Sequence, residues 1–133
     1  MGIYFFYRVY KEKNDDANYF DRLDLQLTGV IDYLGAPTSA NNFGVIGLTV
    51  LSTNKSHLDE RKNRRYYYCL IKNGRAELYQ YGVNRCQIGD TILLNTKNGL
   101  FVTKRGLEIN SLPILLYTND RFWEFVQNHY QKF

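Results

Sequence analysis

Basic and aromatic side chains stand next to one another at two places in this chain of 133 residues. Arg64 and Arg65 precede Tyr66 and Tyr68, and a second basic group surrounds Phe101. Single-stranded nucleic acids are bound by flat rings on which bases stack and by cations that follow the phosphate backbone. The candidate nucleic-acid-binding residues are therefore Lys55, Lys62, Arg64, Arg65, Tyr66, Tyr68, Lys97, Phe101, Lys104 and Arg105.

Each of these residues also has a purely structural interpretation. The charged stretch 53–65 could be a solvated loop in which Asp59 and Glu60 partly offset the cations. The basic residues near Phe101 could simply be turn residues. Successive residues of a strand point to opposite faces, so Tyr67 points inward if its two neighbours point outward. The sequence leaves these alternatives open.

Residue patterns for catalysis or metal binding are not found. The chain has no nucleophile elbow, no phosphate-binding loop, no HExxH and no glycine-rich dinucleotide turn. The carboxylate pairs Asp15-Asp16 and Asp59-Glu60 lie in charged segments, and two histidines far apart do not suggest a zinc site. We therefore expect a protein that is not an enzyme and needs no cofactor or metal. Cys69 and Cys86 are expected to be free, buried thiols.

Composition favours one small β-rich domain. The sequence holds 12 Tyr and 8 Phe, residues that suit pleated and half-buried surfaces, and 44% of its residues are hydrophobic. The net charge of +4 permits a phosphate-bearing partner without requiring one. The first residues lack the pattern of a secretory signal, and no apolar run reaches the roughly 20 residues that span a bilayer. We expect no contact with a membrane.

The pattern of apolar residues and turns predicts five or six strands followed by one helix. Strands are expected over residues 3–10, 25–33, 43–52, 66–71 and 91–95, with turns at 72–74 and 97–99. The segments 100–103 and 107–109 flank a further turn at 104–106. Gly29 lies inside a predicted strand, which indicates a bulge of the kind that lets a small barrel coil. Whether residues 75–87 continue as a strand or form a loop stays open.

The C-terminal segment has helical periodicity. Asn119 and its neighbours are a cap signal, and Phe122, Val126, Tyr130 and Phe133 recur at three-to-four spacing. Trp123 and Phe125 lie on other sides, so a short helix would leave apolar surface exposed for another protein. The candidate partner-binding residues are Phe122, Trp123, Phe125, Val126 and Tyr130.

Several stretches together resemble a known family, chiefly Leu27-Thr28-Gly29-Val30-Ile31, Ala36-Pro37-Thr38 with the strand after it, and Ile88-Gly89-Asp90-Thr91-Ile92. Through them residues 25–130 resemble the protection-of-telomeres family of oligonucleotide/oligosaccharide-binding (OB) folds. The likeness extends to Tyr66 to Ile71 and to Leu112-Pro113-Ile114, whereas residues 3–10 have no place in it and 75–87 is longer than the family pattern. The resemblance predicts an all-β fold, a five-stranded OB barrel at 25–117, with an N-terminal extension at 1–24 and a C-terminal helix at 118–133, in one domain.

Two functions follow from the resemblance. The first is binding of single-stranded DNA, or RNA, as part of a telomere maintenance complex on nuclear chromosomes. The second is a small structural OB subunit of a CST-like or replication-protein-A-like complex that acts mainly through protein contacts. Its partner would be a second OB subunit, or another copy bound through the C-terminal helix.

Overall fold

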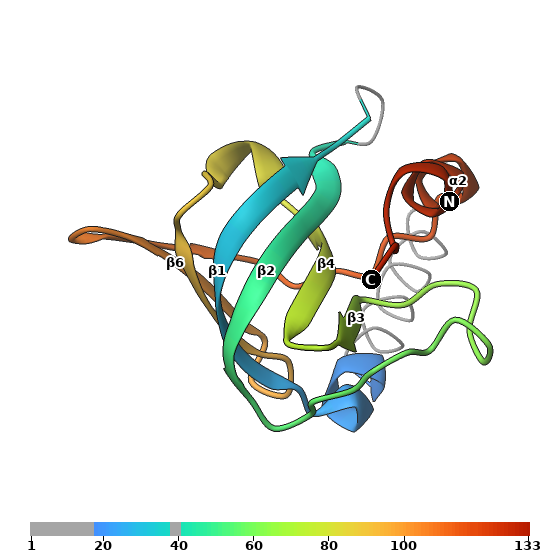
Figure 1. The fold of residues 1–133 in the computed structure, drawn as a ribbon, viewed down its shortest axis with the longest axis horizontal. Coiled ribbons are helices and arrows are strands. Elements are labelled where there is room, and N and C mark those ends of the chain that lie inside the picture. Colours follow the sequence, from blue (N-terminus) through green and yellow to red (C-terminus); the bar gives the residue numbers. More distant parts are fainter. Residues whose placement is uncertain (1–17, 38–40) are drawn as a thin grey trace, which may run out of the picture.

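The computed structural model describes residues 18–37 and 41–133 (Figure 1). The strand expected over residues 3–10 lies outside this part of the chain. Residues 18–23 are helical. The other elements are β1 (Gln26–Gly35), β2 (Phe43–Thr53), β3 (Cys69–Lys72), β4 (Arg75–Tyr81), the 3-10 helix η1 (Val83–Arg85), β5 (Thr91–Asn95), β6 (Leu100–Arg105), β7 (Glu108–Leu112) and the helix α2 (Asp120–His129).

The described strands form one antiparallel sheet in the order β3-β4-β2-β1-β5-β6-β7. Four of them make a Greek key, because β1, β2 and β4 are neighbours and β5 returns to lie beside β1. The expected all-β class with a C-terminal helix is confirmed. The five-stranded closed barrel is not confirmed, since the sheet has seven strands and no described pairing joins β3 to β7.

Glycine lets the long strand β1 bend. The register between β1 and β2 shifts at Thr28/Gly29 and again between Ile31 and Tyr33, which confirms the predicted bulge at Gly29. A Cβ at Gly29 would lie 2.9 Å from the carbonyl oxygen of Thr49, so the two strands approach here more closely than other residues allow. The sheet therefore curls, and β1, β2, β4 and β6 surround a common interior in Figure 1.

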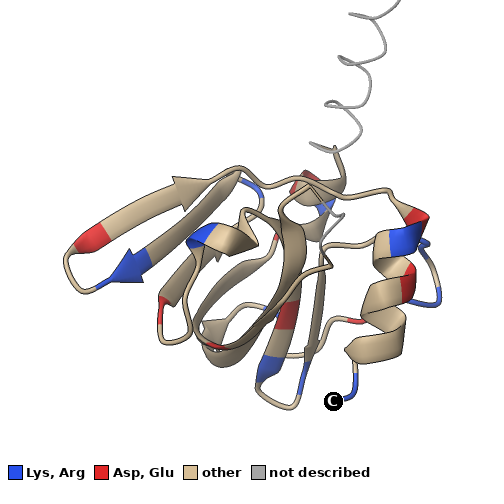
Figure 2. Ribbon diagram, turned by 90° about the horizontal axis from the view of Figure 1, so that it is seen from above, with Lys and Arg blue, Asp and Glu red and all other residues tan. Residues whose placement is uncertain are grey.

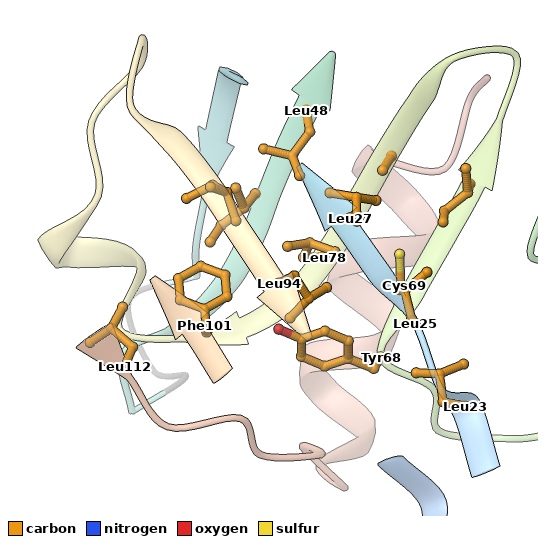
Figure 3. Close-up of a cluster of buried hydrophobic side chains, with 14 of the residues drawn as sticks. Leu23, Leu25, Leu27, Leu48, Tyr68, Cys69, Leu78, Leu94, Phe101 and Leu112 are labelled. Atoms are coloured by element: carbon orange, nitrogen blue, oxygen red, sulfur yellow. The ribbon is translucent and has the colours of Figure 1, made fainter. Parts of the chain in front are cut away.

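The main hydrophobic core fills the inside of this curled sheet. Figure 3 shows leucines of β1, β2, β4 and β5 pointing toward Tyr68 and Phe101. Three residues of the helical segment 18–23 also belong to it, namely Tyr19, Phe20 and Leu23. Cys69 and Cys86 are free and buried, as predicted, and burial raises the pKa of the Cys86 thiol to about 11. The segment assigned to an N-terminal extension thus ends inside the core.

Most predicted strands lie where the sequence placed them, with two changes near the middle of the chain. Residues 75–81, left open, form β4 after a turn in which Asn73 and Gly74 have φ of 55° and 75°. The preceding strand begins only at Cys69 rather than at Tyr66. The backbone N–H of Tyr68 is diverted from the ladder, because it donates to the Tyr19 hydroxyl at 3.0 Å.

The helix α2 covers the outer face of β2 and β4. The Asn119 side chain caps it by accepting hydrogen bonds from the N–H groups of Arg121 and Phe122. The hairpin of β6 and β7 lies at the opposite end of the molecule from α2 in both ribbon views (Figures 1 and 2). Across residues 18–37 and 41–133, no helix combines the length and the apolar character needed to cross a bilayer.

An ion pair between the buried carboxylate of Asp90 and the partly exposed Arg105 holds the chain between β4 and β5 against β6. The Asp90 side chain is 2% exposed and accepts from Nε and Nη2 of Arg105, both at 2.9 Å, and from the N–H of Gln87 at 2.9 Å. The hydrogen bonds from Arg105 hold the pKa of Asp90 below its ordinary value. Arg105, predicted to bind nucleic acid, is therefore occupied within the fold.

We predict that Asp90→Asn lowers the free energy of unfolding by about 2 kcal/mol at pH 7, because a buried acceptor of charged donors is weakened. A folded pKa below the unfolded one stabilises the protein above the unfolded value of about 3.9, and this stabilisation is lost as the pH falls through the folded pKa. Urea unfolding at pH 7 and at pH 3 measures both effects.

The matched control is Asp120→Asn, which breaks the ion pair with Arg65. The side chains of Arg65 and Asp120 are 70% and 60% exposed. The loss in this variant should stay below about 1 kcal/mol. Equal losses at the two positions would show that the Asp90 pair stabilises the fold no more than a surface pair.

Candidate functional site

The face of β2 and β4 that looks away from the main core is the surface where the predicted groove should lie. In OB folds the second and third strands carry single-stranded ligands, and in the Greek-key order of this sheet these strands correspond to β2 and β4. Here that face is buried under α2. The second hydrophobic cluster consists of Phe43, Val45, Tyr67, Leu70, Tyr79, Phe122, Trp123 and Val126.

One row of residues crosses this face from β1 to β4. Tyr33 pairs with Gly47, and Gly47 pairs with Glu77. The Tyr33 ring lies across Gly47, where a Cβ would come within 2.2 Å of it, and its hydroxyl donates a short hydrogen bond to Glu77 Oε2. Burial, together with the neighbouring Glu77, raises the pKa of the Tyr33 phenol well above its ordinary value. The phenol thus stays a donor.

Glu77 also fastens the chain that follows α2. Its side chain is buried, and Oε1 accepts from the Tyr79 hydroxyl and from the N–H of Gln131, both at 3.0 Å. Gln131 has a φ of 65°, and its side-chain amide donates to the hydroxyls of Tyr67 at 2.6 Å and Tyr79 at 3.1 Å. The end of the helix is therefore latched to the sheet by a closed set of hydrogen bonds.

The predicted partner-binding stripe is directed into the molecule. Phe122, Trp123 and Val126 are at most 3% exposed, and the Trp123 indole N–H donates to the carbonyl of Tyr117 at 2.8 Å. In this structure these three residues offer no exposed surface to a partner, because they pack against β2 and β4. Phe125 and Tyr130 are half-buried and pack against the same cluster.

Two of the predicted nucleic-acid-binding rings lie in the main core. Tyr68 and Phe101 are fully buried, and the Tyr68 hydroxyl donates to the side chain of Gln80. Phe101 points inward because inward and outward residues alternate along β6, and it is paired with Leu112 on the core side. Neither ring can receive a base in this structure.

The remaining predicted residues divide into bound and exposed groups. Asp120, the first residue of α2, accepts from Arg65 and from the Tyr66 hydroxyl, each at 2.6 Å. Lys62, Lys97 and Lys104 are exposed, and Figure 2 shows basic and acidic segments mixed over the fold. Lys97 lies in the turn before β6, and Lys104 lies near the other end of that strand. The predicted cations therefore do not form a single groove.

Lys55 and Arg64 do come together. They line a hollow of about 440 Å³ between the helical residues 18–23 and the connection from β2 to β3. Arg22 lines it as well, and nothing in the spacing of the sequence singled that residue out. Lys62, another predicted cation, belongs to the same connection. Two of the predicted cations thus line one hollow of the described structure.

No described helix or strand packs on the outer face of β1, β5, β6 and β7, which we call the open face. Cross-strand pairing places Thr28, Leu93, Val102 and Ser111 in one row, flanked by Leu100 on one side and by Lys104 with Ile109 on the other. Every one of these residues is half-buried or exposed. Sequence reasoning missed this face because its residues are ordinary strand residues.

The far end of the hairpin adds to the exposed apolar surface. Leu107 is 101% exposed, Ile109 is 63% exposed and Leu100 is 44% exposed.

Within the described residues, no three His, Cys, Asp or Glu side chains gather in a way that could hold a metal ion. Comparison of the chain with protein-family models, curated proteins and solved structures found no match.

We predict that Gly47→Ala lowers the free energy of unfolding by about 1–3 kcal/mol, because the new methyl group overlaps the Tyr33 ring. In the background of Tyr33→Ala the same substitution should cost much less, since the overlap requires both side chains. A double-mutant cycle by urea unfolding measures this coupling, and strictly additive losses would contradict it.

A second substitution tests the role of α2. Trp123→Ala should lower the free energy of unfolding by about 3–5 kcal/mol, because a buried indole leaves a cavity against Tyr67 and Tyr79. Phe125→Ala, on the half-buried side of the same helix, should cost clearly less. Thermal unfolding of both variants compares them, and similar small losses would mean that α2 is dispensable for the fold.

Proposed function

We propose that the chain is an OB-type structural subunit that binds another protein through the open face and the edge of β7. Three features support the OB assignment: the Greek-key order of the central strands, the bulged first strand and the chain segment that approaches the end of β4. There the Gln80 amide donates to the carbonyl of Pro113 at 2.7 Å. This contact narrows the opening of the curled sheet without adding a strand pair.

The outer edge of β7, with which no described strand pairs, carries the proposal. Natural edge strands are guarded by charged side chains, above all lysine, by proline, by a bulge or by a covering loop. β7 pairs with β6 in unbroken register and holds no lysine or proline among its five residues; its one charged residue is Glu108, at the start of the strand. The other edge, β3, is covered, because Leu58 and Ile71 exchange backbone hydrogen bonds of 3.0 and 2.9 Å.

A partner that adds a β-strand to the sheet would use both the edge of β7 and the exposed apolar side chains beside it. Its backbone would pair with the free edge of β7, and its apolar side chains would cover Ile109 and the neighbouring open face. By the resemblance, the partner would be a second OB subunit in a telomere complex on nuclear chromosomes. The burial of the β2–β4 face favours protein binding over the single-strand groove, because that face is already occupied by α2.

We predict that Leu107→Ser combined with Ile109→Ser weakens partner binding about tenfold or more without changing the stability of the free chain. Leu107 and Ile109 are exposed, so their loss should affect only the complex. The matched control is Leu115→Ser, since Leu115 is 38% exposed but lies outside the hairpin. Affinity capture of the partner from source cells, followed by titration of the purified partner, gives the measurement.

Hydrogen exchange of the complex adds a readout that is specific for the edge. The amides of residues 108–112 that face away from β6 should become protected when the partner binds. A partner that is bound equally by the hairpin variant and the control, with no protection at these amides, would overturn the proposal.

Binding of a single-stranded nucleic acid is a second candidate function. It is favoured by the cations on the connection between β2 and β3. Lys55 and Arg64 line the hollow together with Arg22, and Lys62 is exposed on the same connection. Fluorescence-anisotropy titrations with telomeric, scrambled and duplex oligonucleotides test it. Lys62→Ala should weaken binding to every sequence and flatten its salt dependence, because a phosphate contact is sequence-independent.

A further inference from the structure

The hollow beside the helical residues 18–23 has the chemistry of an anion site. Its polar lining consists of Asn18, Tyr19, Arg22, Lys55, Glu60 and Arg64. Three of these side chains are cations and one is a carboxylate, so the described residues give the lining a net charge of +2. None of the ion pairs between described residues involves any of these four charged groups.

Arg64 is held in place with its outer N–H groups available. Its guanidinium carbon lies 4.2 Å from the centre of the Tyr19 ring, and its Nε donates to the carbonyl of Tyr66 at 3.0 Å. The two terminal NH₂ groups donate to no described residue. A guanidinium that is stacked and fixed in this way loses little entropy when it binds a planar pair of oxygens.

The wall behind Arg64 is rigid. The Tyr19 hydroxyl donates to Oε1 of Glu60 at 2.7 Å and accepts from the backbone N–H of Tyr68 at 3.0 Å. The Tyr19 ring is 7% exposed and packs edge-on against Phe20. Glu60 is thereby drawn to the tyrosine side of the hollow, and Arg22 and Lys55 are left to face an incoming ligand.

We propose that this hollow binds a phosphate monoester. A monoester carries about −1.5 to −2 charges at pH 7, which matches the lining, whereas each phosphodiester within a nucleic-acid strand carries only one. The ligand is either free phosphate or the terminal phosphate of a strand. In the second case the inference rests on the single-strand function above, and it is independent of partner binding through β7.

The first experiment uses inorganic phosphate and the full chain. Isothermal titration at low ionic strength should show saturable binding, and Lys55→Ala and Arg22→Gln should each weaken it about tenfold. The matched control is Lys72→Ala, which removes the exposed lysine at the end of β3 and should bind as tightly as the unmodified chain. Unchanged melting temperatures without phosphate would show that the variants are folded.

The second experiment separates the two sources of phosphate. Two oligothymidylates labelled at the 3′ end, one with a 5′-phosphate and one with a 5′-hydroxyl, are titrated by anisotropy. A preference for the 5′-phosphate that disappears in Lys55→Ala assigns the hollow to strand ends. Equal binding of both oligonucleotides, with phosphate binding retained, assigns it to free phosphate and overturns the strand-end form.

Absence of phosphate binding, or binding that is indifferent to Arg22 and Lys55, overturns the proposal altogether. Neither result changes what is expected for partner binding by the hairpin variants, because Leu107 and Ile109 do not line the hollow. Failure of the phosphate site and failure of the partner surface are therefore separate outcomes.

Discussion

A buried carboxylate beneath a helix is the constraint on which this architecture depends. Glu77 is 1% exposed, and it is satisfied only because Tyr33, Tyr79 and the backbone of Gln131 all donate to it. A buried charge without such partners would be strongly destabilising. The β2–β4 face, the tyrosines around it and the end of α2 must therefore assemble together, and Gly47 must leave room for the Tyr33 ring.

This assembly gives the molecule two unlike outer faces. Under α2 the sheet is buried on both sides, so its central strands behave like those of a closed core. On the open face, the outward side chains of β5 and β6 are half-buried or exposed, and no described strand pairs with the outer edge of β7. The β2–β4 face, which corresponds in topology to a ligand groove, is therefore covered by α2. Any binding surface must lie on another part of the molecule.

The connection between β2 and β3 joins these parts. Through Arg65 and Tyr66 it contacts the start of α2, through Leu58 it covers the edge of β3, and through Tyr19 and Glu60 it packs on the helical residues 18–23. A segment that reads as a solvated charged loop is therefore anchored at several points. Its cations are consequently held in defined places, which is the basis for treating the hollow as a site.

Local features of this protein could be predicted from the sequence. They are the strands expected at 25–33, 43–52 and 91–95, found at 26–35, 43–53 and 91–95, the bulge at Gly29, the turns with glycine, the capped helix and the free buried thiols. These follow from periodicity and backbone preference, which act over a few residues. Tertiary structure alone decided which face each aromatic side chain occupies. Tyr68 and Trp123 look like binding residues in the sequence, but they are buried because distant strands and α2 enclose them. The open edge of β7 and the meeting of Arg22 with Lys55 depend likewise on contacts between segments far apart in the chain, and no local pattern encodes such contacts.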